Sequence, residues 1–361
     1  MNSIYDIFTA GAMGMYWQEI NQNQVPYLFQ ALFPPKKKSG LKLKWIKGYK
    51  RLPVALMPSA FDAKPTLRDR IGVRLEETRM PFFREAMRIG EEDRQQLLTL
   101  LATNQAYVQD IITNIFDDVT ELVKGALVVA EQMATQLLVD AKISIKARED
   151  SGITVNYDYN YDPTGEWTST NVVKLSSATD KWDDHENSKP ITDILTIKRK
   201  AKAKGVTLKR AILTTTTWLH LMENKSIKMD INITSGQNII LTDSDLESYL
   251  LKKTGIQFVV YDNMYQGENG QDKQFYPDGY IAFLPAGTLG NMYYGTTPEE
   301  ADLLGTANKD AEVNIVNTGI AILTKKESLP VNVITSVSQI VLPSFENMES
   351  VYVLNALGVG E

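Results

Sequence analysis

The chain of 361 residues has no cysteine and only two histidines, His185 and His220. Without cysteine it can form no disulfide, thiolate zinc site, iron–sulfur cluster or cysteine nucleophile. The absence of disulfides also fits folding in a reducing cytosol. Thiol chemistry is therefore excluded, and a mechanism that needs several imidazoles is nearly excluded.

Long apolar runs are also missing, since no stretch approaches the roughly 18 apolar residues of a membrane span. The first ten residues contain Asp6 but no Lys or Arg, unlike a secretory signal. The net charge is −6 and the pI is near 5.3. Because phosphate contacts need clustered Lys and Arg, this balance argues against a dedicated nucleic-acid binder, although not against a protein that encloses DNA. We expect a soluble protein that stays inside a cell until lysis.

Catalytic motifs are absent as well: no dinucleotide or Walker phosphate loop, no nucleophile elbow and no His-Glu-x-x-His. Residues 182–186 (WDDHE) offer metal-type ligands, but adjacent carboxylates in a polar loop are usually solvated. We interpret His220 as a structural histidine rather than a base. The alternation in residues 157–162 fits a strand edge facing a neighbouring subunit better than a sugar platform. The sequence thus predicts no enzyme, no catalytic residue, no cofactor and no metal.

The strongest local signal is an apolar repeat at helical spacing over residues 105–142. Such a helix would extend roughly 57 Å at about 1.5 Å per residue. Glu91, Glu92 and Asp93 precede it, where negative charge suits a helix N-terminus. Because no second helix of matching length occurs, we expect this helix to pack on a sheet.

Two stretches near the start look unable to fold alone. Residues 1–35 predict an arm, in which Gly11 and Gly14 interrupt any helix and the following prolines enforce extended backbone. Alternating residues 41–45 and 71–76 predict two strands joined by a long, proline-marked loop. A two-stranded tongue of this kind cannot bury both faces within its own chain. We therefore expect the arm and the tongue to find burial on neighbouring copies.

Residues 36–51 contain eight basic residues and no acidic one. They form either a solvated strand face or a contact with acidic surfaces of neighbouring subunits; phosphate binding is less favoured, because stacking aromatics are sparse. Complementary charge would set register and partner choice. The candidate inter-subunit residues are Lys42, Lys44, Lys47, Lys50, Arg51, Arg68, Arg70, Arg74, Glu91, Glu92 and Asp93.

The second half of the chain predicts an α/β lobe followed by further strands. Helices at 191–204 and 243–253 alternate with strands at 206–213, 256–261 and 280–284. The strands after residue 326 most simply complete a sheet begun at Ile143. The lobe would then be an insertion into a first domain.

Two strings, residues 26–34 (PYLFQALFP) and 46–53 (IKGYKRLP), resemble the N-terminal segment and the extended-loop start of the lambda-like major capsid protein E family of tailed bacteriophages. The order of parts is similar over nearly the whole chain. The resemblance implies an α+β fold of the Hong Kong type. It also implies an N-terminal arm (1–40), an extended loop (41–90), a peripheral domain with a spine helix (91–169 and 326–361) and an axial domain (170–325).

The resemblance further implies a structural subunit that self-assembles into hexamers and pentamers. These would form an icosahedral shell around double-stranded phage DNA, which the shell encloses without sequence-specific binding. We expect assembly in the host cytoplasm with a portal protein and, as a further candidate, a decoration protein. Many relatives begin with a scaffold-like segment that a protease removes. Here the shell-like pattern starts near residue 1, so we expect a separate scaffolding protein and no large N-terminal cleavage. The alternatives are an encapsulin-like cellular shell protein and a phage tail component.

Overall fold

The computed structural model describes residues 9–21, 27–47, 74–91, 95, 99, 107–148, 154–232, 240–267, 270–304, 310–328 and 331–358. The chain divides into two compact units, each built from three separated segments. Unit 1 comprises Met1–Trp45, Glu76–Ala134 and Gly290–Ser344, and unit 2 comprises Ile46–Leu75, Thr135–Leu289 and Phe345–Glu361.

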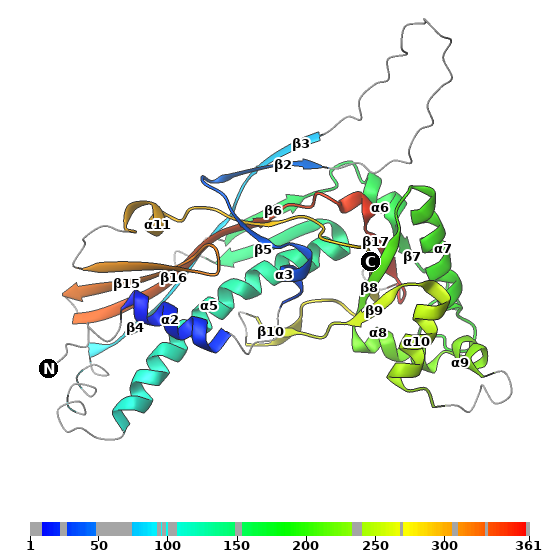
Figure 1. Cartoon of the computed structure of the whole chain (residues 1–361), viewed down its shortest axis with the longest axis horizontal. Helices are drawn as coiled ribbons and strands as arrows, with labels where there is room; N and C mark the ends of the chain where they lie inside the picture. The colour runs from blue at the N-terminus through cyan, green and yellow to red at the C-terminus, as the bar shows by residue number, and fades with distance from the viewer. Residues whose placement is uncertain are drawn as a thin grey trace, which may run out of the picture. The chain divides into compact units, whose positions relative to one another are not determined.

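Unit 1 is organised around the long strand β16 (Val331–Pro343). One edge of β16 pairs with β15 (Ile320–Ser328), which pairs in turn with β14 (Ala311–Val316). The other edge pairs first with β4 (Phe82–Ile89) and then, near its end, with β13 (Met292–Tyr294). These pairs are antiparallel, whereas β1 (Pro35–Lys37) pairs with β13 in parallel. Figure 1 shows β14, β15 and β16 as the orange strands.

The predicted long helix is confirmed as α5 (Tyr107–Asp140). At about 1.5 Å per residue it is roughly 50 Å long. Within unit 1 its apolar repeat buries Val123, Ala130 and Met133. The Gln339 side chain of β16 donates a hydrogen bond of 2.7 Å to the carbonyl oxygen of Ala126, so the helix lies on the six-stranded sheet. The expected packing of the helix on a sheet is therefore confirmed.

The expectation that no stretch approaches a membrane span is wrong by length and composition alone, because Phe116–Asp140 of α5 is long and apolar enough to cross a membrane. Most of this stretch is buried inside the fold, and buried core helices of soluble proteins pass the same test. The apolar character of α5 is accounted for by its packing within the fold.

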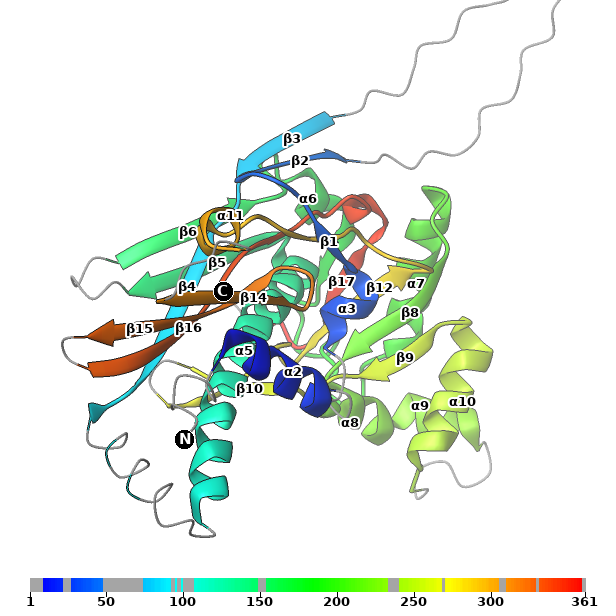
Figure 2. The same cartoon turned by 60° about the vertical axis from the view of Figure 1, so that its left-hand side comes forward.

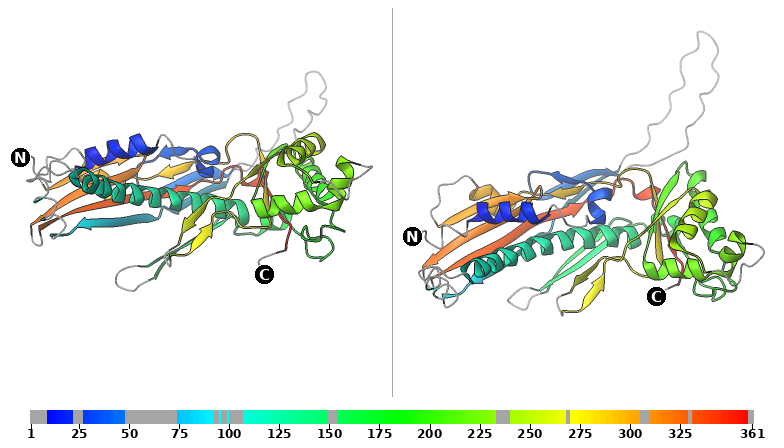
Figure 3. Two further views of the ribbon diagram at one scale, coloured as in Figure 1. Left: turned by 90° about the horizontal axis from the view of Figure 1, so that it is seen from below. Right: turned by 60° about the horizontal axis from the view of Figure 1, so that its bottom comes forward.

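Helices cover both faces of the unit 1 sheet. Thr335 and Gln339 are four residues apart on β16 and therefore point to one face. Thr335 reaches Met13 of α2 (Ala10–Asn21) and Gln339 reaches α5, so both helices lie on that face (Figures 2 and 3). Ser338 points to the opposite face and contacts Glu299 of α11 (Pro298–Asp302). The core of unit 1 therefore lies between the sheet and the pair α2 and α5.

The prediction that Gly11 and Gly14 interrupt a helix is wrong, because α2 runs through both of them. A Cβ atom on Gly14 would lie 2.0 Å from Nδ2 of Asn314 on β14. The glycine is needed for close approach of the helix to the sheet, and this packing outweighs its low helix propensity. The second arm helix is α3 (Leu28–Leu32).

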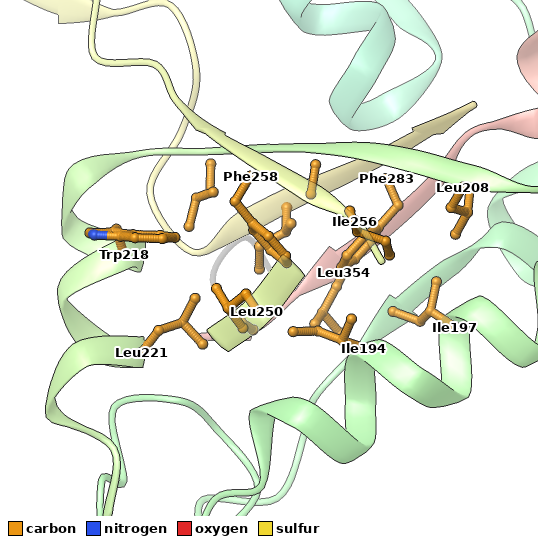
Figure 4. Close-up of a cluster of buried hydrophobic side chains, with 14 of the residues drawn as sticks. Ile194, Ile197, Leu208, Trp218, Leu221, Leu250, Ile256, Phe258, Phe283 and Leu354 are labelled. Atoms are coloured by element: carbon orange, nitrogen blue, oxygen red, sulfur yellow. The ribbon is translucent and has the colours of Figure 1, made fainter. Parts of the chain in front are cut away.

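Unit 2 contains a five-stranded sheet of β7 (Val172–Lys174), β17 (Tyr352–Asn355), β12 (Tyr280–Pro285), β8 (Leu208–Leu213) and β9 (Gln257–Val260), in that order. Its helices are α6 (Glu166–Asn171), α7 (Pro190–Ala203), α8 (Thr215–Glu223), α9 (Lys225–Ile231) and α10 (Asp243–Thr254). Ile194, Leu250, Phe258, Phe283 and Leu354 meet in one hydrophobic cluster (Figure 4). The predicted α/β lobe is confirmed at this level.

Local signals placed the ends of α10 correctly. Thr242 and Asp245 form a capping box at its start, and Gly255 ends it in the left-handed conformation with φ 67°. The remaining elements of the described chain are three hairpins and a short 3-10 helix. These are β2 (Lys42–Lys47) with β3 (Arg74–Arg79), β5 (Lys142–Arg148) with β6 (Thr154–Asn160), β10 (Met264–Gln266) with β11 (Asp272–Gln274), and η2 (Met348–Ser350).

The C-terminal strands do not complete a sheet begun at Ile143, so that prediction is wrong. In the described residues β5 pairs with β6, whereas β16 joins the unit 1 sheet and β17 joins the unit 2 sheet. A connection of two residues between β15 and β16 makes them antiparallel neighbours, and this local pairing prevails over a distant one. Residues 290–325, expected in the axial domain, lie in unit 1.

Candidate functional site

No group of three or more His, Asp or Glu side chains able to hold a metal ion occurs within the part of the chain that the structure describes. The features that bear on function are the base of the β2–β3 hairpin, the arm helices and one histidine pair. The arm and the hairpin base contain or adjoin residues that the sequence singled out for inter-subunit contact.

Two predicted contact residues, Lys42 and Lys44, are already paired within the chain. Their ammonium groups lie 3.1 and 2.9 Å from the two carboxylate oxygens of Glu77 on the opposite strand. Hydrogen bonds from Lys44 and then Lys42 lower the pKa of the Glu77 carboxyl. Leu43, between the lysines, is buried. The two ion pairs to Glu77 therefore hold the two strands of the hairpin base together, and Leu43 and Trp45 of β2 are buried within their own chain.

The structure describes only some of the other residues that we predicted to contact neighbouring subunits. Glu91 is exposed. Lys47 and Arg74 lie in β2 and β3, but their side chains fall outside the described residues. Lys50, Arg51, Arg68, Arg70, Glu92 and Asp93 lie entirely outside them. Their contact with neighbouring copies stays a prediction.

The basic residues just before the hairpin also have partners on their own chain. Lys37 on β1 forms an ion pair with Glu300 of α11 and donates a hydrogen bond of 3.0 Å to the carbonyl oxygen of Gly295. Lys36 and Lys38 each lie 5.8 Å from the ring centroid of Tyr293, a cation–π distance. Sequence reasoning missed these partners because they lie some 260 residues along the chain.

Just after the hairpin, Arg84 on β4 pairs with Glu299, the neighbour of Glu300 in α11. Glu299 is only 4% exposed, and its second carboxylate oxygen accepts a hydrogen bond of 2.8 Å from Ser338 of β16. The Arg84 guanidinium also lies 4.8 Å from the ring centroid of Phe82. A buried carboxylate needs such partners, because burial of an unpaired charge is strongly unfavourable.

The arm helix α3 is held by a buried carboxylate of α5. Glu131 is fully buried, and its two oxygens accept hydrogen bonds from the backbone N–H groups of Leu28 (3.2 Å) and Phe29 (2.8 Å). These are donors at the start of a helix, where backbone N–H groups lack intrahelical partners. Phe29 and Leu32 are buried beside them. The carboxylate therefore fixes both the position and the starting point of α3.

The helix α2 is held at several points on unit 1. The Tyr16 hydroxyl donates a hydrogen bond of 2.8 Å to Asp117 of α5, and the Asn314 amide donates one of 3.3 Å to the carbonyl oxygen of Ala10. Met13 and Trp17 of α2 are buried. The expectation that the arm finds burial only on neighbouring copies is therefore wrong for α2 and α3. Both helices bury their apolar faces on their own chain.

The two histidines, far apart in sequence, meet in unit 2. Nε2 of His185 lies 2.9 Å from Nδ1 of His220 on α8, and Nδ1 of His185 lies 3.3 Å from a carboxylate oxygen of Glu223. Burial lowers the pKa of His220 and repulsion from His185 lowers it further, whereas Asp183, Glu223 and Asp278 oppose the shift. The interpretation of His220 as a structural histidine is consistent with this geometry, although no pattern in the sequence indicated His185 as its partner.

Asp162, at the end of the tyrosine-rich alternation, caps α6 rather than lying on a strand edge. Its carboxylate accepts hydrogen bonds from the backbone N–H groups of Trp167 (3.2 Å) and Thr168 (2.8 Å). Tyr157 and Tyr159 lie on β6 and are half-buried. The alternation therefore contains one structural cap within an otherwise strand-like segment.

Comparisons with known proteins give one family match and several similar folds. A family model described as phage major capsid protein E matches residues 13–351. A prophage protein of Escherichia coli CFT073, assigned as a capsid protein, is similar in structure with a TM-score of 0.57 and 14% identity over 96% of this chain and 99% of that chain. A phage-related protein of Bordetella bronchiseptica RB50 gives a TM-score of 0.55 and 13% identity over 98% and 99%. No curated protein matches by sequence.

Proposed function

Since the chain belongs to the phage major capsid protein E family, we propose that it builds an icosahedral shell from rings of five and six copies. Membership makes the chain a structural subunit of a phage capsid and a virion component, not an enzyme. It also favours a capsid over the encapsulin-like shell protein and the tail component. The match over residues 13–351, across both units, is the observation that carries the proposal.

We assign a role to each part of the subunit by its resemblance to the fold family. Residues 1–40 act as the arm and 41–90 as an extended loop that overlies the next subunit. Residues 91–169 and 326–361 form the peripheral domain, and residues 170–325 form the axial domain around five-fold and six-fold axes, with residues 290–325 moved to the peripheral domain because they lie in unit 1 with most of α5. The loop from Asn263 to Asp272, which contains β10 and reaches the start of β11, is a candidate for the axial contacts. Contacts repeated around a ring stabilise a closed assembly, because each copy contributes at several places.

The predicted contact residues fit this proposal, although two of them, Lys42 and Lys44, also have a partner within their own chain. Lys42 and Lys44 keep side-chain exposures of 71% and 52% while bound to Glu77, so they remain accessible to a neighbour. Their role is to shape the hairpin base as well as to meet acidic groups on the next copy. The basic residues Lys47, Lys50, Arg51, Arg68, Arg70 and Arg74 would add to these contacts, and Glu91, Glu92 and Asp93 would supply the opposite charge.

The shell has further partners under this proposal. A separate scaffolding protein directs assembly in the host cytoplasm, a portal protein occupies one vertex, and a decoration protein is a candidate for the outer surface. The interior encloses double-stranded DNA without base-specific contact. The net charge of −6 supports this, since it disfavours tight binding to phosphate.

Negative-stain microscopy of the expressed full chain, with and without a candidate scaffolding protein, tests the proposal. Closed shells, or rings of five and six, are expected. Particles that contain DNA after infection distinguish a capsid from a shell that packages enzymes. A chain that stays monomeric under every assembly condition would contradict the proposal.

A further inference from the structure

The two ends of the extended loop are held by two adjacent glutamates. The chain enters the loop from β1, which carries Lys37, and leaves it into β4, which carries Arg84. Lys37 pairs with Glu300 and Arg84 pairs with Glu299. Neighbouring residues on a helix point about 100° apart, so one short helix can reach two different strands. In Figures 1 and 2, α11 lies on the side of the unit 1 sheet that faces β2 and β3.

The position of α11 is itself fixed. Thr297 is fully buried, and its hydroxyl accepts a hydrogen bond of 3.3 Å from the backbone N–H of Glu300, which caps the helix. Pro298 occupies the first turn, where its restricted backbone suits a helix start. Ser338 holds the carboxylate of Glu299 from the sheet below. The helix that carries Glu299 and Glu300 is therefore held in place on the unit 1 sheet.

The segment that leads into α11 touches both ends of the loop as well. The carbonyl oxygen of Gly295 accepts a hydrogen bond from Lys37, on the incoming side. A Cβ atom on Gly295 would lie 2.9 Å from Cε of Met80, on the outgoing side, and 2.7 Å from Cγ2 of Ile340. The Met80 N–H in turn donates a hydrogen bond of 2.9 Å to the carbonyl oxygen of Leu41, which closes the loop at its base.

From these contacts we propose that Glu299 and Glu300 form a two-point clamp that fixes the direction of the β2–β3 base on unit 1. The glutamates are positioning residues: they act on the neighbouring subunit only through the loop. This inference rests on the proposed overlap of the loop with the next copy. It goes further by assigning to α11, more than 200 residues away in sequence, the control of where that overlap begins.

The direct test uses the full chain as a monomer, before any assembly. In the double variant Glu299→Gln, Glu300→Gln, amide hydrogen exchange should rise about tenfold for residues 41–45 and 76–80, because local opening follows the loss of charged contacts. Amides in the β14–β15–β16 ladder should keep their wild-type rates. The matched control is Glu327→Gln, which removes the Lys325–Glu327 ion pair from the same sheet without touching the loop. Unchanged exchange at the loop base in the double variant would overturn the inference.

A charge swap separates positioning from general stability. Lys37→Glu and Glu300→Lys should each loosen the base, and the combined variant should recover part of the lost protection, because the ion pair is re-formed with reversed sign while the hydrogen bond from Lys37 to the Gly295 carbonyl oxygen is not. A combined variant as loose as the two single ones would also overturn the clamp. The loop-overlap proposal is judged separately by assembly of the wild-type chain. If wild type forms shells but the double variant forms them equally well despite a loosened base, the clamp does not control assembly.

Discussion

Nε2 of His185 lies 2.9 Å from Nδ1 of His220, so the only two imidazoles of the chain share one hydrogen bond. One of them must accept in this bond and must therefore be neutral. The groups that face the pair are Glu223 at His185 and the carboxylates of Asp183 and Asp278 near His220. The bond connects the loop before α7 to α8 within unit 2.

This relationship predicts acid sensitivity of unit 2. The pKa of His220 is lowered in the folded chain by burial and by His185. The unfolded chain therefore binds the proton more readily, and stability that is complete above the ordinary histidine pKa of about 6.5 falls as the pH drops through the folded value. Urea midpoints of unit 2, followed by hydrogen exchange between pH 7.5 and 5, should fall less steeply in His220→Gln than in wild type. Equal slopes would refute a contribution from His220.

A pair of glycines in helices should respond in opposite ways to alanine. Gly14→Ala would place a methyl group 2.0 Å from Nδ2 of Asn314 and displace its hydrogen bond to Ala10, so we expect a loss of about 1–2 kcal/mol. Gly125→Ala meets nothing within 4 Å and should gain about 0.5–1 kcal/mol from helix propensity. Thermal midpoints of the two variants provide the measurement. A stabilising Gly14→Ala would show that the Asn314 side chain moves aside at no cost.

The buried carboxylate of Glu131 should control the order of α3. Glu131→Gln replaces one acceptor oxygen with an amide donor that faces a backbone N–H, so about 2 kcal/mol of anchoring should be lost. Limited proteolysis near residues 28–33 should then accelerate while α5 stays protected. Glu121→Gln on the same helix is the control, because its exposed pair with Lys124 contributes only about 0.3 kcal/mol. Equal proteolysis in the two variants would count against the anchor.

The hydrophobic cluster of unit 2 should be an independent core. Phe283→Ala removes a fully buried ring that lies edge-on to Phe258, and large-to-small changes of this kind cost about 3–5 kcal/mol. We expect faster amide exchange throughout β8, β12 and β17, with unit 1 unchanged. Simultaneous loosening of the β14–β15–β16 ladder would show that the two units do not unfold separately.

The sequence predicted those elements whose signals are local. The period of α5 was readable because its buried residues recur over 34 positions, and α10 carries its own cap and stop signals. The arm was misjudged because the helical role of Gly14 depends on Asn314, which is 300 residues away. The C-terminal strands were misplaced because strand periodicity indicates a buried face but does not identify the partner.

The ion pairs of residues 36–51 could not be predicted from the sequence either. The run of lysines in residues 36–51 was recognised, but its acidic partners Glu77 and Glu300 come from a different strand and from α11. Both interpretations of this run, a solvated strand face and a contact with neighbouring subunits, left out partners on the same chain. Family resemblance, carried by short strings and by the order of parts, identified the function without identifying any of these pairs.

Because α2 and α3 already rest on their own polypeptide, the conformational entropy of those segments is lost during folding and not at each encounter between subunits. For the arm, association then joins surfaces that are already formed, and pre-formed surfaces bind with a smaller entropic cost. The order of the arm should accordingly be independent of protein concentration. The rate of shell nucleation would then depend on how often correctly oriented subunits collide. Folding of α2 and α3 would not limit that rate.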